Sequence, residues 1–90
     1  MVPKSRSGMN PGDLVFFKYR YGEWTAVLVV SPVMKDAKTG NRLFTGFKVP
    51  LDEEYTPKSL TSLYKNKELP KENYRTYILN RIKSPIRRIK

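Results

Sequence analysis

The sequence predicts an all-β fold, a small barrel of five short strands with one short helix before the fourth strand. The chain has 90 residues, which is enough for one small domain and excludes larger architectures. Strand-length runs of β-branched and aromatic residues recur between turn signals. Five such runs and one helical segment are typical of a small closed or half-closed barrel.

The first two strands form a predicted hairpin. Pro11-Gly12-Asp13 is a turn, and it precedes a strand over 14–19 that is rich in aromatic and β-branched residues. Residues 20–23 have the length and the glycine of a hairpin turn. The next strand, 24–30, is apolar on both faces and is therefore expected at the centre of the sheet. Trp24 opens this strand, and we expect its side chain to be substantially buried.

A loop, a third strand and a helix are predicted next. Residues 32–41 show no periodicity and carry turn residues, so we expect a flexible loop. The pattern over 42–49 predicts a strand in which Gly46 marks a bulge or a bend. Thr56 has the character of an N-cap before a proline, which predicts a helix over 57–65.

The end of the chain predicts two further strands. Residues 74–79 alternate and are rich in strand formers. The isoleucines at 78, 82, 86 and 89 also fit a helical stripe, but Ser84-Pro85 argues against a continuous helix, because the residue before proline avoids the α region. We expect a short last strand, 86–90, which would pair with the first strand and close the sheet.

Two segments resemble known small barrels. The segment GDLVFFKYRYGEWTAVLVV at 12–30 resembles the first hairpin of SH3-like modules such as PWWP, Tudor and KOW domains. The segment YRTYILNRIKS at 74–84 is similar to the closing segment of WYL domains, which are also SH3-like barrels. Both resemblances imply the same architecture, an SH3-like five-stranded barrel. Stand-alone barrels with this ending also look like short bacteriophage proteins.

The domain organisation follows from these assignments. Residues 1–10 are expected to form a flexible N-terminal tail, and residues 11–90 the barrel. A second methionine, Met9, makes residues 1–8 consistent with an expression scar. No apolar run approaches the roughly 20 residues of a membrane span, and the N-terminus lacks the hydrophobic region of a secretory signal. We therefore expect a cytoplasmic protein with no membrane partner; the sequence leaves its oligomeric state open.

Positive charge is the strongest functional signal. Eighteen Lys and Arg against eight Asp and Glu give a net charge of +10, of which residues 73–90 supply +6 with no acid. Such asymmetry favours a polyanionic partner, most often DNA or RNA. The alternative is a solvated strand whose charges protect a sheet edge. The expected nucleic-acid contacts are Lys18, Arg20, Arg75, Arg81, Lys83, Arg87, Arg88 and Lys90.

Aromatic side chains interleave with cations along Phe17-Lys18-Tyr19-Arg20-Tyr21, and again at Phe47-Lys48. This pattern suits base stacking beside phosphate pairing. Tyr19, Tyr21 and Trp24 are the candidate stacking or docking aromatics. A methyl-lysine cage would need several of these rings to converge on one cation.

The chain has no Cys and no His, which excludes disulfides, zinc sites of the usual kind and the commonest catalytic bases and nucleophiles. Asp52-Glu53-Glu54 is the only acidic cluster, and its adjacent carboxylates do not have metal-site spacing. We expect no catalysis, no cofactor and no metal. The sequence predicts a nucleic-acid-binding protein that contacts mainly backbone phosphates. The alternative is a phage-type interaction module that docks on and modulates a host protein, such as a polymerase, a nuclease or a defence factor.

Overall fold

The computed structural model describes residues 10–18, 22–50 and 54–82, and the backbone of residues 87–89. Within these residues the chain is mostly strands in an antiparallel sheet, with a single α-helix. The strands are β1 (Leu14–Lys18), β2 (Trp24–Val29), β3 (Met34–Lys35), β4 (Arg42–Lys48), β5 (Tyr74–Ile78) and β6 (Arg87–Ile89); the helix is α1 (Pro57–Lys65), and two 3₁₀ turns are η1 (Lys71–Asn73) and η2 (Leu79–Arg81). Residues 1–9 of the predicted tail lie outside the described residues.

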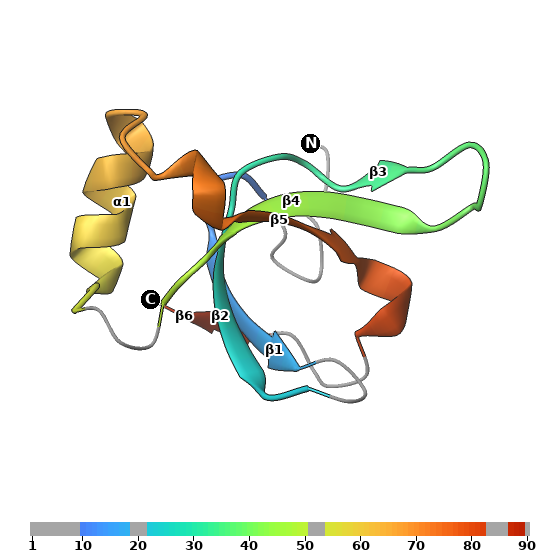
Figure 1. Ribbon diagram of the computed structural model, residues 1–90, viewed down its shortest axis with the longest axis horizontal. Coiled ribbons are helices and arrows are strands. Elements are labelled where there is room, and N and C mark those ends of the chain that lie inside the picture. Colours follow the sequence, from blue (N-terminus) through green and yellow to red (C-terminus); the bar gives the residue numbers. More distant parts are fainter. Residues whose placement is uncertain (1–9, 19–21, 51–53, 83–86, 90) are drawn as a thin grey trace, which may run out of the picture.

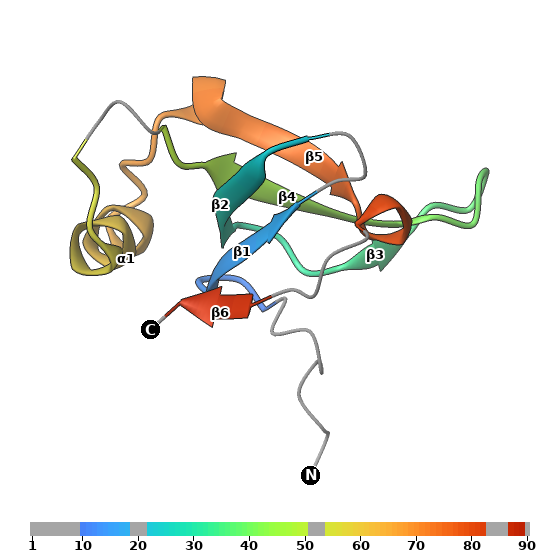
Figure 2. The same cartoon turned by 90° about the horizontal axis from the view of Figure 1, so that it is seen from below.

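Strand β2 lies between β1 and β4, as its two apolar faces predicted. β6 pairs with the other edge of β1, which confirms the predicted return of the last strand to the first. β5 pairs with β4, and Figure 2 shows the succession from β6 through β1 to β2. The sheet bends so that the β1–β2 hairpin and the β4–β5 pair form two layers (Figure 1). Among the described strands β5 and β6 do not pair with each other, so the predicted closure is not observed.

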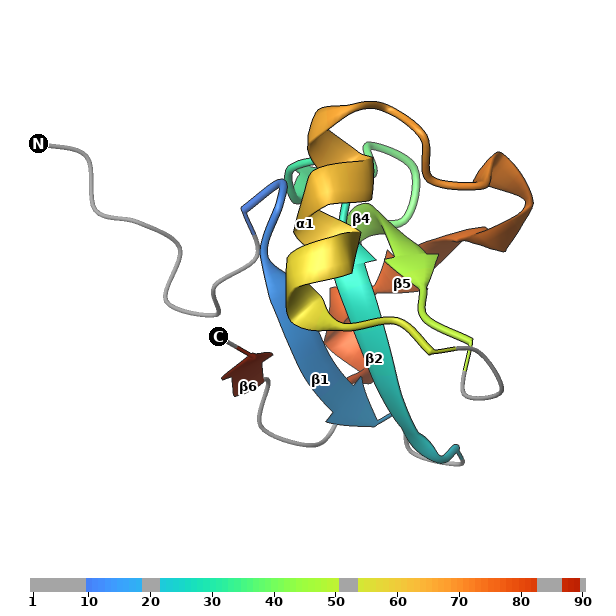
Figure 3. The same ribbon diagram turned by 90° about the vertical axis from the view of Figure 1, so that its left-hand side faces the viewer.

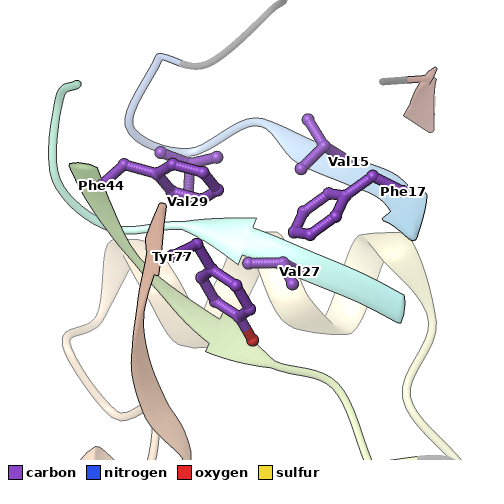
Figure 4. Close-up of a cluster of buried hydrophobic side chains, with 6 residues drawn as sticks. All are labelled: Val15, Phe17, Val27, Val29, Phe44 and Tyr77. Carbon is purple, nitrogen blue, oxygen red and sulfur yellow. The ribbon is translucent and has the colours of Figure 1, made fainter. Parts of the chain in front are cut away.

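The first core cluster lies between these two layers (Figure 4). It is made of the buried residues Val15, Phe17, Val27, Val29, Phe44 and Tyr77. Phe17 meets Tyr77 edge to face, with ring centroids 5.4 Å apart, and Phe44 stacks on Tyr77 at 5.3 Å. These aromatic contacts connect β1 to β4 and β5, although neither strand pairs with β1.

The second core cluster lies on the other face of the sheet, under α1 (Figure 3). Leu60 of the helix is buried there with Leu14, Leu28 and Phe47 of the strands, and with Leu69 of the following connector. Adjacent residues of a strand point to opposite faces, so Leu28 packs under the helix while Val27 and Val29 pack inside the bend. The central strand is therefore buried on both sides.

Helix α1 begins and ends at the predicted residues, and Thr56 is its N-cap as predicted. The Thr56 side chain accepts a hydrogen bond from the Ser59 backbone amide at 3.0 Å, and the Ser59 hydroxyl accepts one from the Thr56 amide at 2.9 Å. This reciprocal pair is a capping box that satisfies two backbone donors at the helix start. Pro57 follows at the first helical position, where it has no amide hydrogen to satisfy.

The predicted flexible loop at 32–41 is wrong in one respect, because it contains strand β3. Met34 and Lys35 pair with Leu43 and Arg42 of β4. Asp36 organises the turn between them: its carboxylate accepts hydrogen bonds from the Lys38 amide and the Thr39 hydroxyl, each at 3.0 Å. Local side-chain acceptance of this kind fixes a turn without any hydrophobic periodicity. With β3 counted, α1 precedes the fifth described strand rather than the fourth.

Gly46 makes no bulge against β5, because the β4–β5 register runs through it with Arg75 opposite. Against β2 the register ends at Gly46, opposite Val29, and the Val30 and Ser31 amides then both donate to the Thr45 carbonyl. A Cβ at this position would collide with the Val27 Cγ1 atom. Gly46 is therefore required by the close packing of β4 against a buried, branched side chain of β2.

Gly46→Ala is expected to lower the free energy of unfolding by about 2–3 kcal/mol, because the new methyl overpacks a stiff, buried valine. Urea denaturation followed by far-UV circular dichroism measures this loss. Adding Val27→Ala to Gly46→Ala should recover part of this lost stability, since the smaller side chain at position 27 leaves room for the new methyl group at position 46.

Gly40→Ala is the matched control. Gly40 has a φ of +75°, and a methyl group added there would have no neighbour within 4 Å. Only the backbone cost of about 1 kcal/mol is therefore expected. Equal losses for the two variants would contradict the packing explanation.

Candidate nucleic-acid interface

Trp24 is not buried, contrary to the sequence prediction. Its side chain is 41% exposed. It stacks on Phe16, with ring centroids 5.0 Å apart and ring planes 14° from parallel. Lys18 is the cross-strand partner of Trp24 and is exposed. The hairpin thus presents the half-exposed Trp24 indole, held against Phe16, next to the cation Lys18.

The position of α1 explains this exposure. Trp24, Ala26 and Leu28 share one face of β2, and α1 packs on that face, with Leu60 in the same cluster as Leu28. The helix has nine residues and is therefore only about 14 Å long. Figure 3 shows the hairpin end at which β2 begins extending beyond the helix. An apolar strand predicts burial only along the length that another element covers.

A depression of about 430 Å³ lies beside Trp24, between the start of β2, the end of β4 and β5. Its lining residues are Gly22, Glu23, Trp24, Thr25, Lys48, Arg75, Thr76 and Tyr77. Two predicted site residues, Trp24 and Arg75, therefore come together in it. Lys48 joins them with a second positive charge, and Glu23 is the only carboxylate among the described lining residues.

Arg75 is held in place by the backbone of its own strand and the preceding turn. Its Nη1 atom donates to the Glu72 carbonyl at 2.7 Å and to the Tyr74 carbonyl at 2.9 Å. These bonds occupy one of the guanidinium nitrogens, and a guanidinium has five N–H donors in all. Arg75 is therefore oriented by the chain and keeps donors with which to bind an anion.

Arg81 lies in a different place. It is exposed in η2, outside the lining of the depression at Trp24. The adjacent Asn80 side chain accepts a hydrogen bond from the Arg42 amide at 2.9 Å, which attaches η2 to the start of β4. Lys35 is the cross-strand partner of Arg42, so the cations near Arg81 belong to the β3–β4 hairpin.

The remaining predicted contacts are described in part or not at all. Tyr19, Arg20, Tyr21, Lys83 and Lys90 lie outside the described residues. For β6 the description covers the backbone only: Arg87 is opposite Phe16 in the register, and Arg88 is opposite Val15. The pairing therefore brings the basic C-terminal strand alongside the strand that carries Phe16 and Lys18.

Sequence reasoning missed several cations. Lys48 follows Phe47 in an interleaved pair, and that pattern was a signal that could have found it. A second depression, of about 480 Å³, is lined by Val30, Tyr64, Lys65, Lys67, Leu69, Lys71 and Tyr74. Its three lysines come from the end of α1 and the polar connector after it, and no sequence motif marks them as a site.

The described residues offer no metal site and no membrane span. Residues 10–18, 22–50 and 54–82 contain no cluster of three or more Asp or Glu side chains suited to a metal ion. Asp52 and Glu53 of the acidic cluster lie outside these residues. The single described helix is too short to cross a membrane.

Comparisons with known proteins give no match for this chain, whether with protein-family models, with curated proteins or with solved structures. The function proposed below therefore depends on the chemistry of the described surface.

Trp24→Ala is expected to lower the free energy of unfolding by only about 1–2 kcal/mol, because it removes one partly exposed aromatic pair. Phe17→Ala is the matched variant. Phe17 is 1% exposed, so its loss should be about 3–5 kcal/mol. Urea denaturation monitored by circular dichroism compares the two, and a Trp24→Ala loss as large as that of Phe17→Ala would place Trp24 in the core.

Proposed function

We propose that this chain is a small, non-catalytic SH3-like domain that binds nucleic acid mainly through backbone phosphates, with a base stacked on Trp24. One observation carries the proposal: Trp24, whose half-exposed indole stacks on Phe16, lines a depression together with Lys48 and Arg75. Nucleic-acid-binding surfaces combine cations that follow the backbone with aromatic rings on which bases stack.

The charge of the chain supports the same function. A net charge of +10 over 90 residues attracts a polyanion at long range and raises its rate of encounter. Each phosphate contact then displaces a condensed counterion, so affinity falls as salt rises. Backbone contacts of this kind position the nucleic acid without reading its sequence.

The strand arrangement supports the SH3-like part of the proposal. β1, β2, β4 and β5 follow one another as antiparallel neighbours, and β6 returns to β1. The first and last described strands therefore lie side by side, and a β5–β6 pair, which the described strands do not form, would be the step that closes the barrel. The aromatic contacts of Phe17 with Phe44 and Tyr77 join the two layers across the bend.

A second candidate function is docking on a host protein. Trp24 is 41% exposed and Met34 is 65% exposed, and exposed large apolar side chains favour protein contacts.

The fluorescence of Trp24 tests the proposed interface directly, because it is the only tryptophan in the chain. Single-stranded oligonucleotides should quench it at low salt, with an affinity that falls steeply as salt rises. Lys48→Gln and Arg75→Gln should each reduce the log–log salt slope by about 0.7 for a single strand.

Lys58→Gln is the control for this experiment. Lys58 is exposed on α1 and does not line the depression at Trp24, so its slope should be nearly unchanged. The proposal fails if binding is absent at low salt, if it does not respond to salt, or if all three variants lose the same amount.

The triple variant Arg87→Gln, Arg88→Gln, Lys90→Gln separates the two candidate functions. If these residues contact duplex phosphates, the log–log salt slope should fall by up to about 3, at roughly 0.9 per contact. If the protein docks on a partner through apolar surface, the variant should mainly slow association. An unchanged affinity and slope for nucleic acid would support protein docking.

A further inference from the structure

The depression beneath the end of α1 is separate from the surface at Trp24, and the two share none of the lining residues that the structure describes. It lies between the last turn of α1, the connector that follows, η1 and the start of β5. Its volume of about 480 Å³ is within the range of small-molecule sites, about 300–1,000 Å³.

The walls of this pocket are held by the second core cluster. Val30, Tyr64 and Tyr74 all pack against that cluster, and Leu69 is a buried member of it. The Gly12 backbone also lies close to the Tyr64 ring: a Cβ added at Gly12 would be 3.2 Å from the Tyr64 Cε2 atom. The aromatic surfaces are therefore fixed by packing before any ligand binds, which lowers the entropy cost of binding.

The charged residues that the structure describes in this lining have one sign. Lys65, Lys67 and Lys71 line the pocket, and none of the described lining residues is a carboxylate. Cations near the end of a helix are stabilised by its dipole, which accounts for Lys65 and Lys67. It does not account for Lys71, which begins η1 and faces the same pocket.

Lys67 enters the pocket lining from the turn that ends α1. Lys67 has a φ of +57° and is the only residue other than glycine with a positive φ among those described. It follows the Asn66 cap of α1, where its amide donates to the Tyr64 carbonyl at 3.1 Å. The Glu68 amide donates to the Leu63 carbonyl at 2.9 Å, so the two bonds form a Schellman cap, in which the residue after the cap is left-handed and glycine is favoured.

We propose that this pocket binds a nucleoside phosphate, with the base against Tyr64 and Tyr74 and the phosphate among Lys65, Lys67 and Lys71. Inorganic phosphate would contact the lysines and leave the tyrosine rings without a contact. A neutral nucleoside would contact the tyrosine rings and leave the lysines without an anion. An acidic peptide would supply the charge but not the flat aromatic body that the two tyrosines fit. The ligand is either a free nucleotide or the phosphorylated end of a nucleic-acid strand.

Isothermal titration with adenosine 5′-monophosphate, adenosine and inorganic phosphate tests the site in the full chain. The monophosphate should bind at least ten times more tightly than either part. Lys71→Gln and Tyr74→Leu should each weaken its binding about three- to ten-fold, and Lys58→Gln, on the same helix outside the pocket, should not. Equal affinity for the three probes, or an acidic peptide that binds more tightly than the monophosphate, would overturn the proposal.

Lys67→Gly makes the test independent of folding. Relief of the left-handed lysine should leave the melting temperature unchanged or raise it by up to about 5 °C, while binding of the monophosphate falls about three- to ten-fold. An unchanged affinity would remove Lys67 from the site and overturn the proposal.

The two sources of the ligand and the two surfaces are separated by competition. Displacement of the monophosphate by a 5′-phosphorylated oligonucleotide, but not by its 5′-hydroxyl form, identifies a strand end; no displacement by either identifies a free nucleotide. Both results support the pocket.

The Lys48→Gln and Lys71→Gln variants distinguish the two surfaces. Loss of monophosphate binding in Lys48→Gln but not in Lys71→Gln would place the monophosphate at the Trp24 surface. Failure of oligonucleotides to quench Trp24 would contradict the proposed function while leaving this pocket standing.

Discussion

The burial of β2 on both faces is the constraint on which the rest of this small domain depends. Val27 and Val29 require cover on one side and Leu28 on the other, since each side chain contributes to stability only when it leaves water. The bend of the sheet supplies one cover, through Phe44 and Tyr77, and α1 supplies the other. Gly46 lets β4 approach Val27 closely enough for both layers to meet this strand.

The same arrangement explains why the hairpin has an exposed aromatic pair. A nine-residue helix covers only part of the face it packs on, and the hairpin end of β2 extends beyond it (Figure 3). Phe16 and Trp24 stack on each other. Because the two rings cover each other, their partial exposure costs the fold little stability. The stacked pair provides a rigid apolar surface next to Lys18. The bend also brings β5 towards the start of β2, and this places Arg75 near Trp24.

Positive charge is distributed around aromatic surface in two places. At the hairpin, Lys48 and Arg75 border the depression beside Trp24; beneath α1, three lysines border the pocket of Tyr64 and Tyr74. Cations combined with flat rings complement a ligand that has both phosphates and bases. The two surfaces draw on different residues, so mutations can distinguish them. The exposed Met34 belongs to neither surface.

Elements with local signals could be predicted from the amino-acid sequence. Strand-forming runs predicted β1, β2, β4 and β5, the Thr56-Pro57 cap predicted α1, and the basic last strand was correctly paired with β1. Features that depend on distant residues emerged only in the folded chain: the pairing of two-residue β3, the exposure of Trp24, and the grouping of Lys48 with Arg75 and of Lys67 with Lys71. The physical reason is that periodicity reports which face of an element is apolar, whereas the bend of the sheet and the length of the helix decide how much of that face is covered.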